Sequence, residues 1–316
     1  MKATKLLLIM IILFLSLELS ATKYAGEIFQ LGAGVRNYAL GNCGLTDVNS
    51  TSTAFWNPAL LNLVTENRFE LMHAEEYTGL LTYDTASAIW GKTNKLSIVL
   101  CRIGIDNIPL TELENPDEPI SGENRPYKYS SVNNSDIIVY FGLARKFGEV
   151  NIGITPKFAY RNLAKENGQG FGADISSFFR LNANSILAIK LRDFFTTHIL
   201  WGNGTHEIVN PSLDAEINYR FTLPGLKKRS IAYLRTEIFS EDRDESASLA
   251  LGPFSLDYHA GYEITLHSAV DIFFGYDITN VTTGLSLHIQ NWDINYSFEY
   301  DNVLENSHRI SVGLKL

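Results

Sequence analysis

The residues able to do chemistry are scattered along this chain and form no recognised catalytic motif. Its seven histidines could act as general bases or metal ligands. There is no Gly-x-Ser-x-Gly nucleophile elbow and no His-Glu-x-x-His zinc motif in the sequence. Thr205, His206 and Glu207 stand together, but they offer too few ligands for a zinc site. We therefore expect a non-enzymatic protein with no catalytic residue, cofactor or metal.

Cysteine chemistry is limited to two positions, Cys43 and Cys101. A small secreted scaffold held together by disulfides would have more. The two could pair in an oxidising compartment, but we favour two unpaired buried thiols, and the sequence leaves open whether they meet.

Composition and charge restrict the class of protein. The 316 residues are 45% hydrophobic and 19% charged, with a formal net charge of −9. Nucleic-acid binding requires a basic surface, so we expect no nucleic-acid partner. The 15 Tyr, 18 Phe and 4 Trp suit β-strands. Composition alone fits either a membrane β-barrel or a soluble all-β sandwich.

The N-terminus indicates export. Lys2 and Lys5 precede the apolar run Leu6–Leu17, and small residues follow at Ser20 and Ala21. This is the arrangement of a secretory signal peptide, which we place at residues 1–21. An uncleaved membrane anchor is the alternative. No later stretch is long and apolar enough for a transmembrane helix, which needs roughly 20 residues.

The end of the chain resembles a two-stranded membrane ribbon. In Trp292–Tyr300 every second residue is bulky and apolar, and the residues between are polar or acidic. Arg309–Leu316 repeats the alternation up to the last residue. Successive side chains of a strand point to opposite faces, so one face suits lipid and the other water. Strands of transmembrane β-barrels have this pattern.

The same alternation recurs over residues 66–316, where we predict an antiparallel transmembrane β-barrel of about 14 strands. Most segments reach the roughly 9–11 residues needed to cross a bilayer, whereas sandwich strands are shorter. Short links alternate with longer polar ones, as in barrels with periplasmic turns and outer loops. The longest link, 106–132, is acidic and rich in proline. The expected strands are 67–76, 81–91, 95–105, 133–146, 149–162, 170–181, 185–195, 211–222, 229–240, 247–263 (one bulged strand or two elements), 267–278, 281–290, 291–301 and 307–316.

Residues 22–65 differ from the rest, being rich in Gly, Ala and Asn. The sequence Trp56-Asn57-Pro58 marks a turn or a helix start, because proline suits the first helical position. Gly34–Leu45, Asp47 and Ser52–Ala59 together resemble the N-terminal signature of PorV/PorQ family outer-membrane proteins, which are related to the FadL fatty-acid transporters. Gly170–Asp174 and Ser307–Gly313 extend the resemblance. Asn42-Cys43-Gly44 and the C-terminal Leu316 depart from the family pattern, which usually ends on an aromatic residue.

The resemblance implies that residues 22–65 form a plug inside the barrel, with Trp56, Asn57 and Pro58 as its motif. The alternative is a periplasmic extension with its own small hydrophobic cluster. Alternation places several polar residues on the lumen face, either as a docking surface for the plug or as the ordinary polarity of a lumen. These lumen-facing candidates are Asp214, Glu216, Asp293, Asn295 and Glu299.

Two functions follow from the resemblance. Its PorV side implies a non-enzymatic component of protein export in the bacterial outer membrane, similar to type IX secretion, with secretion-machinery or cargo proteins as partners. Its FadL side implies passive uptake of hydrophobic small molecules. We favour the first. In either case outer-membrane lipid surrounds the barrel, and a soluble periplasmic β protein is the third alternative.

Overall fold

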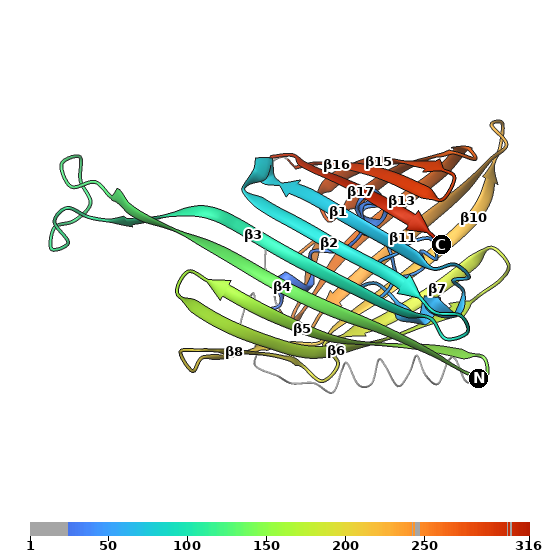
Figure 1. Ribbon diagram of the computed structural model, residues 1–316, viewed down its shortest axis with the longest axis horizontal. Helices are drawn as coiled ribbons and strands as arrows, with labels where there is room; N and C mark the ends of the chain where they lie inside the picture. Colours follow the sequence, from blue (N-terminus) through green and yellow to red (C-terminus); the bar gives the residue numbers. More distant parts are fainter. Residues whose placement is uncertain (1–24, 242, 244–246, 302, 304) are drawn as a thin grey trace.

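The structure is a computed structural model that describes residues 25–316 apart from 242, 244–246, 302 and 304. The predicted signal peptide, residues 1–21, lies outside the described residues. The described chain forms one closed antiparallel sheet around an interior segment (Figure 1). Within it, no helix is long and apolar enough to cross a membrane.

Fourteen strands form the ring, and the last pairs with the first. The closure continues past the strands, because the Asn67 and Leu316 backbones exchange N–H···O bonds of 2.9 and 3.3 Å. The predicted barrel of about 14 strands is confirmed. In chain order the ring contains β1 (Arg68–Glu76), β2 (Leu81–Trp90), β3 (Leu96–Glu112), β4 (Tyr127–Phe147), β5 (Val150–Leu163), β6 (Glu166–Arg180), β7 (Ser185–Arg192), β10 (Ser212–Leu223), β11 (Lys228–Phe239), β13 (Phe254–His267), β14 (Val270–Asp277), β15 (Asn280–Ile289), β16 (Trp292–Tyr300) and β17 (Ser307–Lys315).

Apolar side chains face outward and polar ones inward. Leu71 on β1 and Leu234 on β11 are 51% and 58% exposed, whereas Asp214 on β10 is fully buried. A soluble sandwich would show the reverse, with apolar faces inside. In a bilayer the outward apolar face contacts lipid, and ring closure satisfies every strand edge. The sandwich alternative is therefore wrong.

The two rims of the barrel differ as predicted. Tight turns at 91–95, 148–149, 181–184, 224–227, 268–269 and 290–291 lie at one rim, the periplasmic rim in such barrels. At the opposite, outer rim, the 106–132 link is not a loop as expected. Strands β3 and β4 continue through about half of it as a projecting ribbon that is closed by residues 113–126 (Figure 1). A tight turn at 164–165 also replaces the link expected between the predicted strands 149–162 and 170–181.

The wall is interrupted beside β6. Strands β7 and β8 (Thr197–Trp201) both pair with β6 but are separated by residues 193–196. Strand β9 (His206–Val209) pairs with β8 and leads into β10. The expected 196–210 link thus contains a hairpin. The 247–263 segment divides into β12 (Leu249–Leu251) and β13, which was one of the two predicted possibilities.

The N-terminal segment lies inside the barrel. Its elements are the short helices η1 (Glu27–Phe29), α2 (Val35–Ala39) and η2 (Pro58–Asn62), and a further helical turn, η3 (Tyr77–Gly79), joins β1 to β2. Side chains of the segment form the main buried cluster together with inward residues of β1 to β7. Such a barrel leaves an open interior unless something fills it.

Candidate functional site: the lumen and its N-terminal segment

The Trp56-Asn57-Pro58 motif builds the part of the segment that packs most tightly. Asn57 accepts a hydrogen bond from the Ala59 amide (3.1 Å) and so caps η2, with Pro58 in the first turn. Its side chain also donates to the Leu45 carbonyl (2.8 Å). The Trp56 indole donates to the Ala33 carbonyl (2.7 Å). The motif therefore ties three stretches of the segment together.

Glycines of the wall allow η2 to approach it. A Cβ added at Gly153 on β5 would lie 2.3 Å from the Ala59 amide nitrogen, and one at Gly142 on β4 would lie 2.9 Å from the Ala54 Cα. No residue with a side chain fits at these distances. On the same side, the Phe55 ring packs edge-on against Tyr140 of β4, with centroids 5.2 Å apart.

Glu216, a predicted lumen-facing residue, binds the segment's backbone. Its buried carboxylate accepts hydrogen bonds from the amides of Gly44, Leu45 and Thr46 at 2.8–3.0 Å, and from the Thr46 hydroxyl at 2.5 Å. Three successive N–H groups pointing at one carboxylate satisfy donors that would otherwise be buried without a partner.

Asp214, the neighbouring candidate, belongs to a buried ladder of alternating charge across β5, β6, β7, β10 and β11. Arg192 and Arg235 both donate to its carboxylate, at 2.7 and 2.8 Å. On one side Arg235 also pairs with Glu237 (2.6 Å), and on the other a neighbouring group of ion pairs of 2.6–3.0 Å joins two lysines to two aspartates. Pairing compensates the cost of burying these charges. The other members are Lys157, Asp174, Lys190, Asp193 and Glu237.

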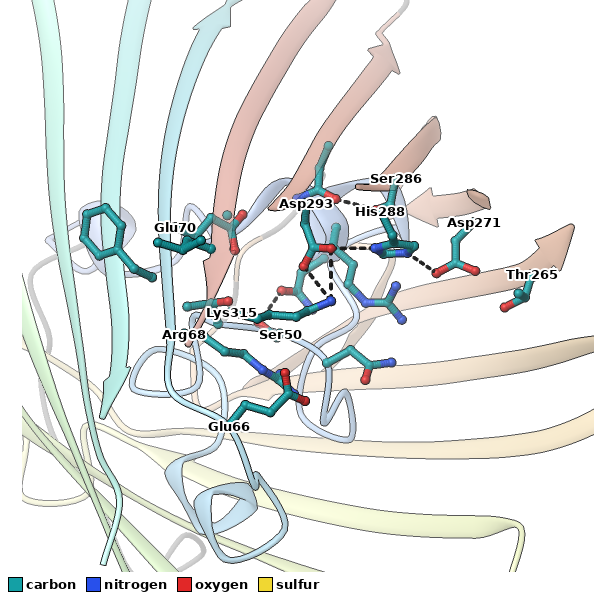
Figure 2. A pocket seen from close by; sticks show the side chains of 18 of the residues that line it. Ser50, Glu66, Arg68, Glu70, Thr265, Asp271, Ser286, His288, Asp293 and Lys315 are labelled. Carbon is teal, nitrogen blue, oxygen red and sulfur yellow. Dashed lines mark hydrogen bonds and ion pairs between the residues drawn. The ribbon is translucent and has the colours of Figure 1, made fainter. Parts of the chain in front are cut away.

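The remaining candidates, Asp293, Asn295 and Glu299, all lie on β16. Asp293 contacts Lys315 (2.8 Å) and His288 (2.6 Å), and it lines a polar cavity of about 540 Å³ near the periplasmic rim. Figure 2 shows His288 lying between Asp293 and Asp271 in this cavity. Asn295 donates to the Ser311 hydroxyl (2.9 Å).

Glu299 lies at the other end of β16. It accepts a hydrogen bond from Arg309 (2.7 Å), whose guanidinium also pairs with Glu76. These residues line a second polar cavity, of about 510 Å³, near the outer rim. We call the two cavities the inner chamber and the outer chamber.

A third cavity is mainly apolar and smaller, about 210 Å³. It lies between the N-terminal segment and the wall, with Ile28 and Leu31 on one side and Leu81, Ile103 and Ile105 on the other. Strand β3 has a bulge beside it, where two residues, 106 and 107, oppose Asn133 of β4. Asn107 adopts a φ of 58°, and its amide donates to the Asn133 side chain (2.9 Å).

Both cysteines are buried and free, as favoured from the sequence. Cys43 packs beside α2 among Ile231, Tyr233 and Phe273, whereas Cys101 belongs to the main cluster and accepts a hydrogen bond from Tyr83. Burial, followed by the nearby Glu216 carboxylate, raises the pKa of the Cys43 thiol well above its usual value. Cys43 is thus a protonated, unreactive thiol while the segment stays in place.

Sequence reasoning missed most of the charged ladder and the apolar cavity. Lys157, Lys190 and Arg192 do occupy inward positions of alternating strands, which was an available signal for the ladder. Their partners come from other strands and could not be assigned. Among the residues that the structure describes, no group of three or more His, Cys, Asp or Glu side chains could hold a metal ion.

No protein-family model matches the chain, and no curated protein matches it either. Solved structures do match in fold. The Ralstonia pickettii toluene transporter TbuX superposes with a TM-score of 0.52 at 9% identity, covering 90% of this chain and 97% of that one. The P. putida toluene transporter TodX superposes with a TM-score of 0.55 at 11% identity, covering 90% of this chain and 96% of that one. The monoaromatic hydrocarbon channel CymD superposes with a TM-score of 0.52 at 11% identity, covering 90% of this chain and 97% of that one.

At these identities the likeness concerns the fold. The chain is an outer-membrane β-barrel with a FadL-like architecture of 14 strands around an N-terminal segment. Its structural neighbours are channels and transporters, not enzymes. Membership of the PorV/PorQ family does not follow from these similarities.

Proposed function

We propose that this barrel admits small hydrophobic molecules through the outer membrane by passive diffusion. This was the second of the two functions inferred from the sequence, and the structural neighbours favour it over protein export. The observation that carries it is the apolar cavity between the N-terminal segment and the wall, beside the bulge of β3.

The size and lining of the cavity suit a small aromatic hydrocarbon. An apolar cavity of roughly 150 Å³ is enough to bind benzene in another protein, and this one measures about 210 Å³. Its isoleucine and leucine side chains offer contact without hydrogen bonds. Arg161 and Asp136, which also line it, pair with each other (2.9 Å), so these two charges already have partners.

The bulge supplies the route by which a hydrophobic molecule would leave the cavity sideways. Inserting an extra residue disrupts the hydrogen-bond ladder locally and bends the strand. Asp106 and Asn107 are both exposed at this point of β3. A molecule leaving there would enter lipid directly and avoid the polar lumen. The plug role of the N-terminal segment is part of the same proposal, because it closes the direct route.

The test is the rate of entry of radiolabelled toluene into cells that express the barrel, lack other hydrocarbon channels and have an intact lipopolysaccharide layer. Ile103→Trp fills the cavity, and deletion of Asn107 removes the bulge. We expect both changes to slow entry to the rate of cells without the barrel. Ile137→Trp, on the exposed face of β4, is the matched control and should leave entry unchanged.

Each variant is first checked for folding by its heat-modifiable migration in detergent gels. If folded Ile103→Trp and the Asn107 deletion both admit toluene at the rate of the unchanged protein, the proposal is wrong. If only the deletion does so, the cavity serves as the binding site but the bulge is not the exit.

Protein export is the second candidate, and the projecting ribbon of β3 and β4 favours it. The ribbon extends well beyond the rest of the outer rim (Figure 1). Its strands are exposed on both faces, as at Tyr127 on one face and Lys128 on the other. Its closing loop contains Glu114, Asp117, Glu118 and Glu123. A long exposed loop of this kind often serves binding.

The export candidate is tested by recovery of partner proteins. The barrel is purified from solubilised native membranes, with and without replacement of 113–126 by a short Gly-Ser turn. Secretion-machinery proteins that copurify with the full ribbon and are lost with the short turn would support export. Shortening the 202–205 turn of the β8–β9 hairpin is the control. Equal recovery from all three proteins would contradict a role of the ribbon.

A further inference from the structure

The two polar chambers lie at opposite ends of the same strands. The inner chamber is lined by the periplasmic ends of β13 to β17 and β1, for example by Asp271 and Lys315. The outer chamber is lined by the outer ends of the same six strands, for example by Asp277 and Arg309, and also by β2 and β11. The lumen beside these six strands is therefore polar at both its periplasmic and its outer end, and one obstruction separates the two ends.

That obstruction is α2. Arg36 and Asn37 border the inner chamber, whereas Tyr38 borders the outer chamber. The wall comes closest to α2 at glycines, and Phe273 of β14 lies beside them, with its ring centroid 4.8 Å from the Arg36 guanidinium carbon. A Cβ at Gly284 would lie 2.6 Å from the Ala39 Cβ, and one at Gly275 would lie 2.1 Å from the Gly41 amide nitrogen. If α2 moved away, it would leave a gap beside Gly275 and Gly284 that is bordered by Phe273.

Buried apolar contacts and a few polar ones hold α2 in place, with Val35 and Tyr38 in the main buried cluster. Arg36 pairs with Asp47 (2.8 Å) and with Glu263 on β13. The Gly41 amide donates to the Thr282 hydroxyl (3.1 Å). Gly34 and Gly41, which flank the helix, have φ angles of 85° and 63°. These glycines permit backbone rotation on either side of α2 at little steric cost.

From this arrangement we propose a further function: α2 is a gate, and its displacement joins the two chambers into a hydrophilic path for small cations. The path is separate from the apolar cavity beside β3. The described residues that line the outer chamber carry more negative than positive groups. Six are acidic: Glu27, Glu76, Glu237, Asp257, Asp277 and Glu299. Three are arginines: Arg235, Arg243 and Arg309.

This imbalance determines which solutes the path favours. Acidic groups lining a pore select cations over anions. The inner chamber has a more even balance, because Arg36, Arg68, Arg229 and Lys315 accompany its carboxylates. We therefore place cation selection in the outer chamber and the gate below it.

The experiment is ion conductance of the purified full-length barrel in planar lipid bilayers bathed in KCl. Arg36→Met removes the cation that ties α2 to Glu263. This change should raise the fraction of time that the path is open by roughly tenfold or more. Removing one partner of a buried ion pair destabilises the closed state by more free energy than a tenfold change in an equilibrium requires. In a KCl gradient, the reversal potential should indicate preference for K⁺ over Cl⁻.

Lys190→Met is the matched control on the opposite side of the lumen. Lys190 is also a buried cation that holds the segment, through the Phe55 carbonyl, but it lies on β7, whereas α2 contacts β14 to β17. It should leave the conductance low. If Arg36→Met does not fold, Glu263→Gln breaks the same pair from the wall and should open the path likewise.

A tether distinguishes movement of α2 from loss of the whole segment. The Ser52 and Ser87 hydroxyls lie 2.8 Å apart, so Ser52→Cys with Ser87→Cys would link the segment to β2. Cys43 and Cys101 are replaced by alanine in that protein. With Arg36→Met, the oxidised tether should leave conductance high. Conductance lost on oxidation and restored by reductant, absence of conductance from both opening variants, or preference for Cl⁻ would each overturn the proposal.

Discussion

The lumen of this barrel is filled in two different ways. On the arc from β2 to β7, Phe55, Trp56 and Leu60 of the N-terminal segment pack into an apolar cluster with inward residues of the wall. On the arc from β13 through β17 to β1, α2 rests on glycines between two polar chambers. One arc is sealed by a large apolar cluster, and the other by a smaller one around Ala39 and Leu40 together with ion pairs and hydrogen bonds.

The difference shows which part of the segment anchors it and which part can move. Burying large apolar side chains is strongly favourable and non-directional. Polar contacts in a lumen have water as a ready alternative partner, so their net contribution is small. We therefore expect the arc around Trp56 to hold the segment in the barrel while the arc around α2 opens and closes.

The largest effect should come from the apolar arc. Trp56→Ala leaves a cavity at a fully buried site and should lower the free energy of unfolding by about 3–5 kcal/mol. Unfolding by urea in lipid vesicles measures it. Trp90→Ala is the control, since Trp90 is 44% exposed on the outer face. Equal effects of the two substitutions would mean that the apolar arc does not anchor the segment, and the proposed difference between the arcs would be wrong.

A smaller effect is expected at Glu216, which holds the segment between the two arcs. Glu216→Gln removes the charge but keeps one acceptor oxygen, and it should lower the free energy of unfolding by about 1–3 kcal/mol, because its amide group then faces buried N–H donors. The same urea titration measures it. Glu75→Gln, an exposed position of β1, should change little. If Glu216→Gln is as mild as that control, backbone recognition by the wall contributes little to retaining the segment.

The smallest expected effect, and the most direct test of the comparison, is a change in the reactivity of the two cysteines. In the unchanged protein we expect neither to react with a maleimide, because both are buried and the raised pKa keeps the Cys43 thiol protonated. In Arg36→Met, Cys43 beside α2 should become reactive while Cys101 in the apolar arc stays protected. Mass spectrometry of the labelled peptides distinguishes them. Equal reactivity would show that both arcs open together.

Much of the fold could be predicted from local pattern. Alternation such as Trp292–Tyr300 marked each of the 14 wall strands, because neighbouring side chains of a strand point to opposite faces whatever the partner strand is. The Asn57-Pro58 pair predicted a helix start, and η2 begins there. The pattern failed at 106–132, because prolines and acidic residues indicate a loop in a sheet but are tolerated in a ribbon exposed on both faces.

For the lumen-facing candidates, too, local pattern predicted some properties and not others. Alternation placed Asp214, Glu216, Asp293, Asn295 and Glu299 on one face of their strands, but their roles differ by location. Glu216 binds backbone amides, Asp214 bridges two arginines, and Asp293 lines the inner chamber. No local feature distinguishes these environments.

The sequence by itself determined the strands, their inward and outward faces and the presence of a distinct N-terminal segment. Each depends on neighbours a few positions apart. Only the tertiary structure decided which charges pair, where cavities remain and what separates them. Arg36 meets Glu263 across 227 positions, and the apolar cavity forms where η1 faces β2, β3 and β5. Such contacts depend on how the closed ring brings distant residues together, which alternation along one strand does not encode.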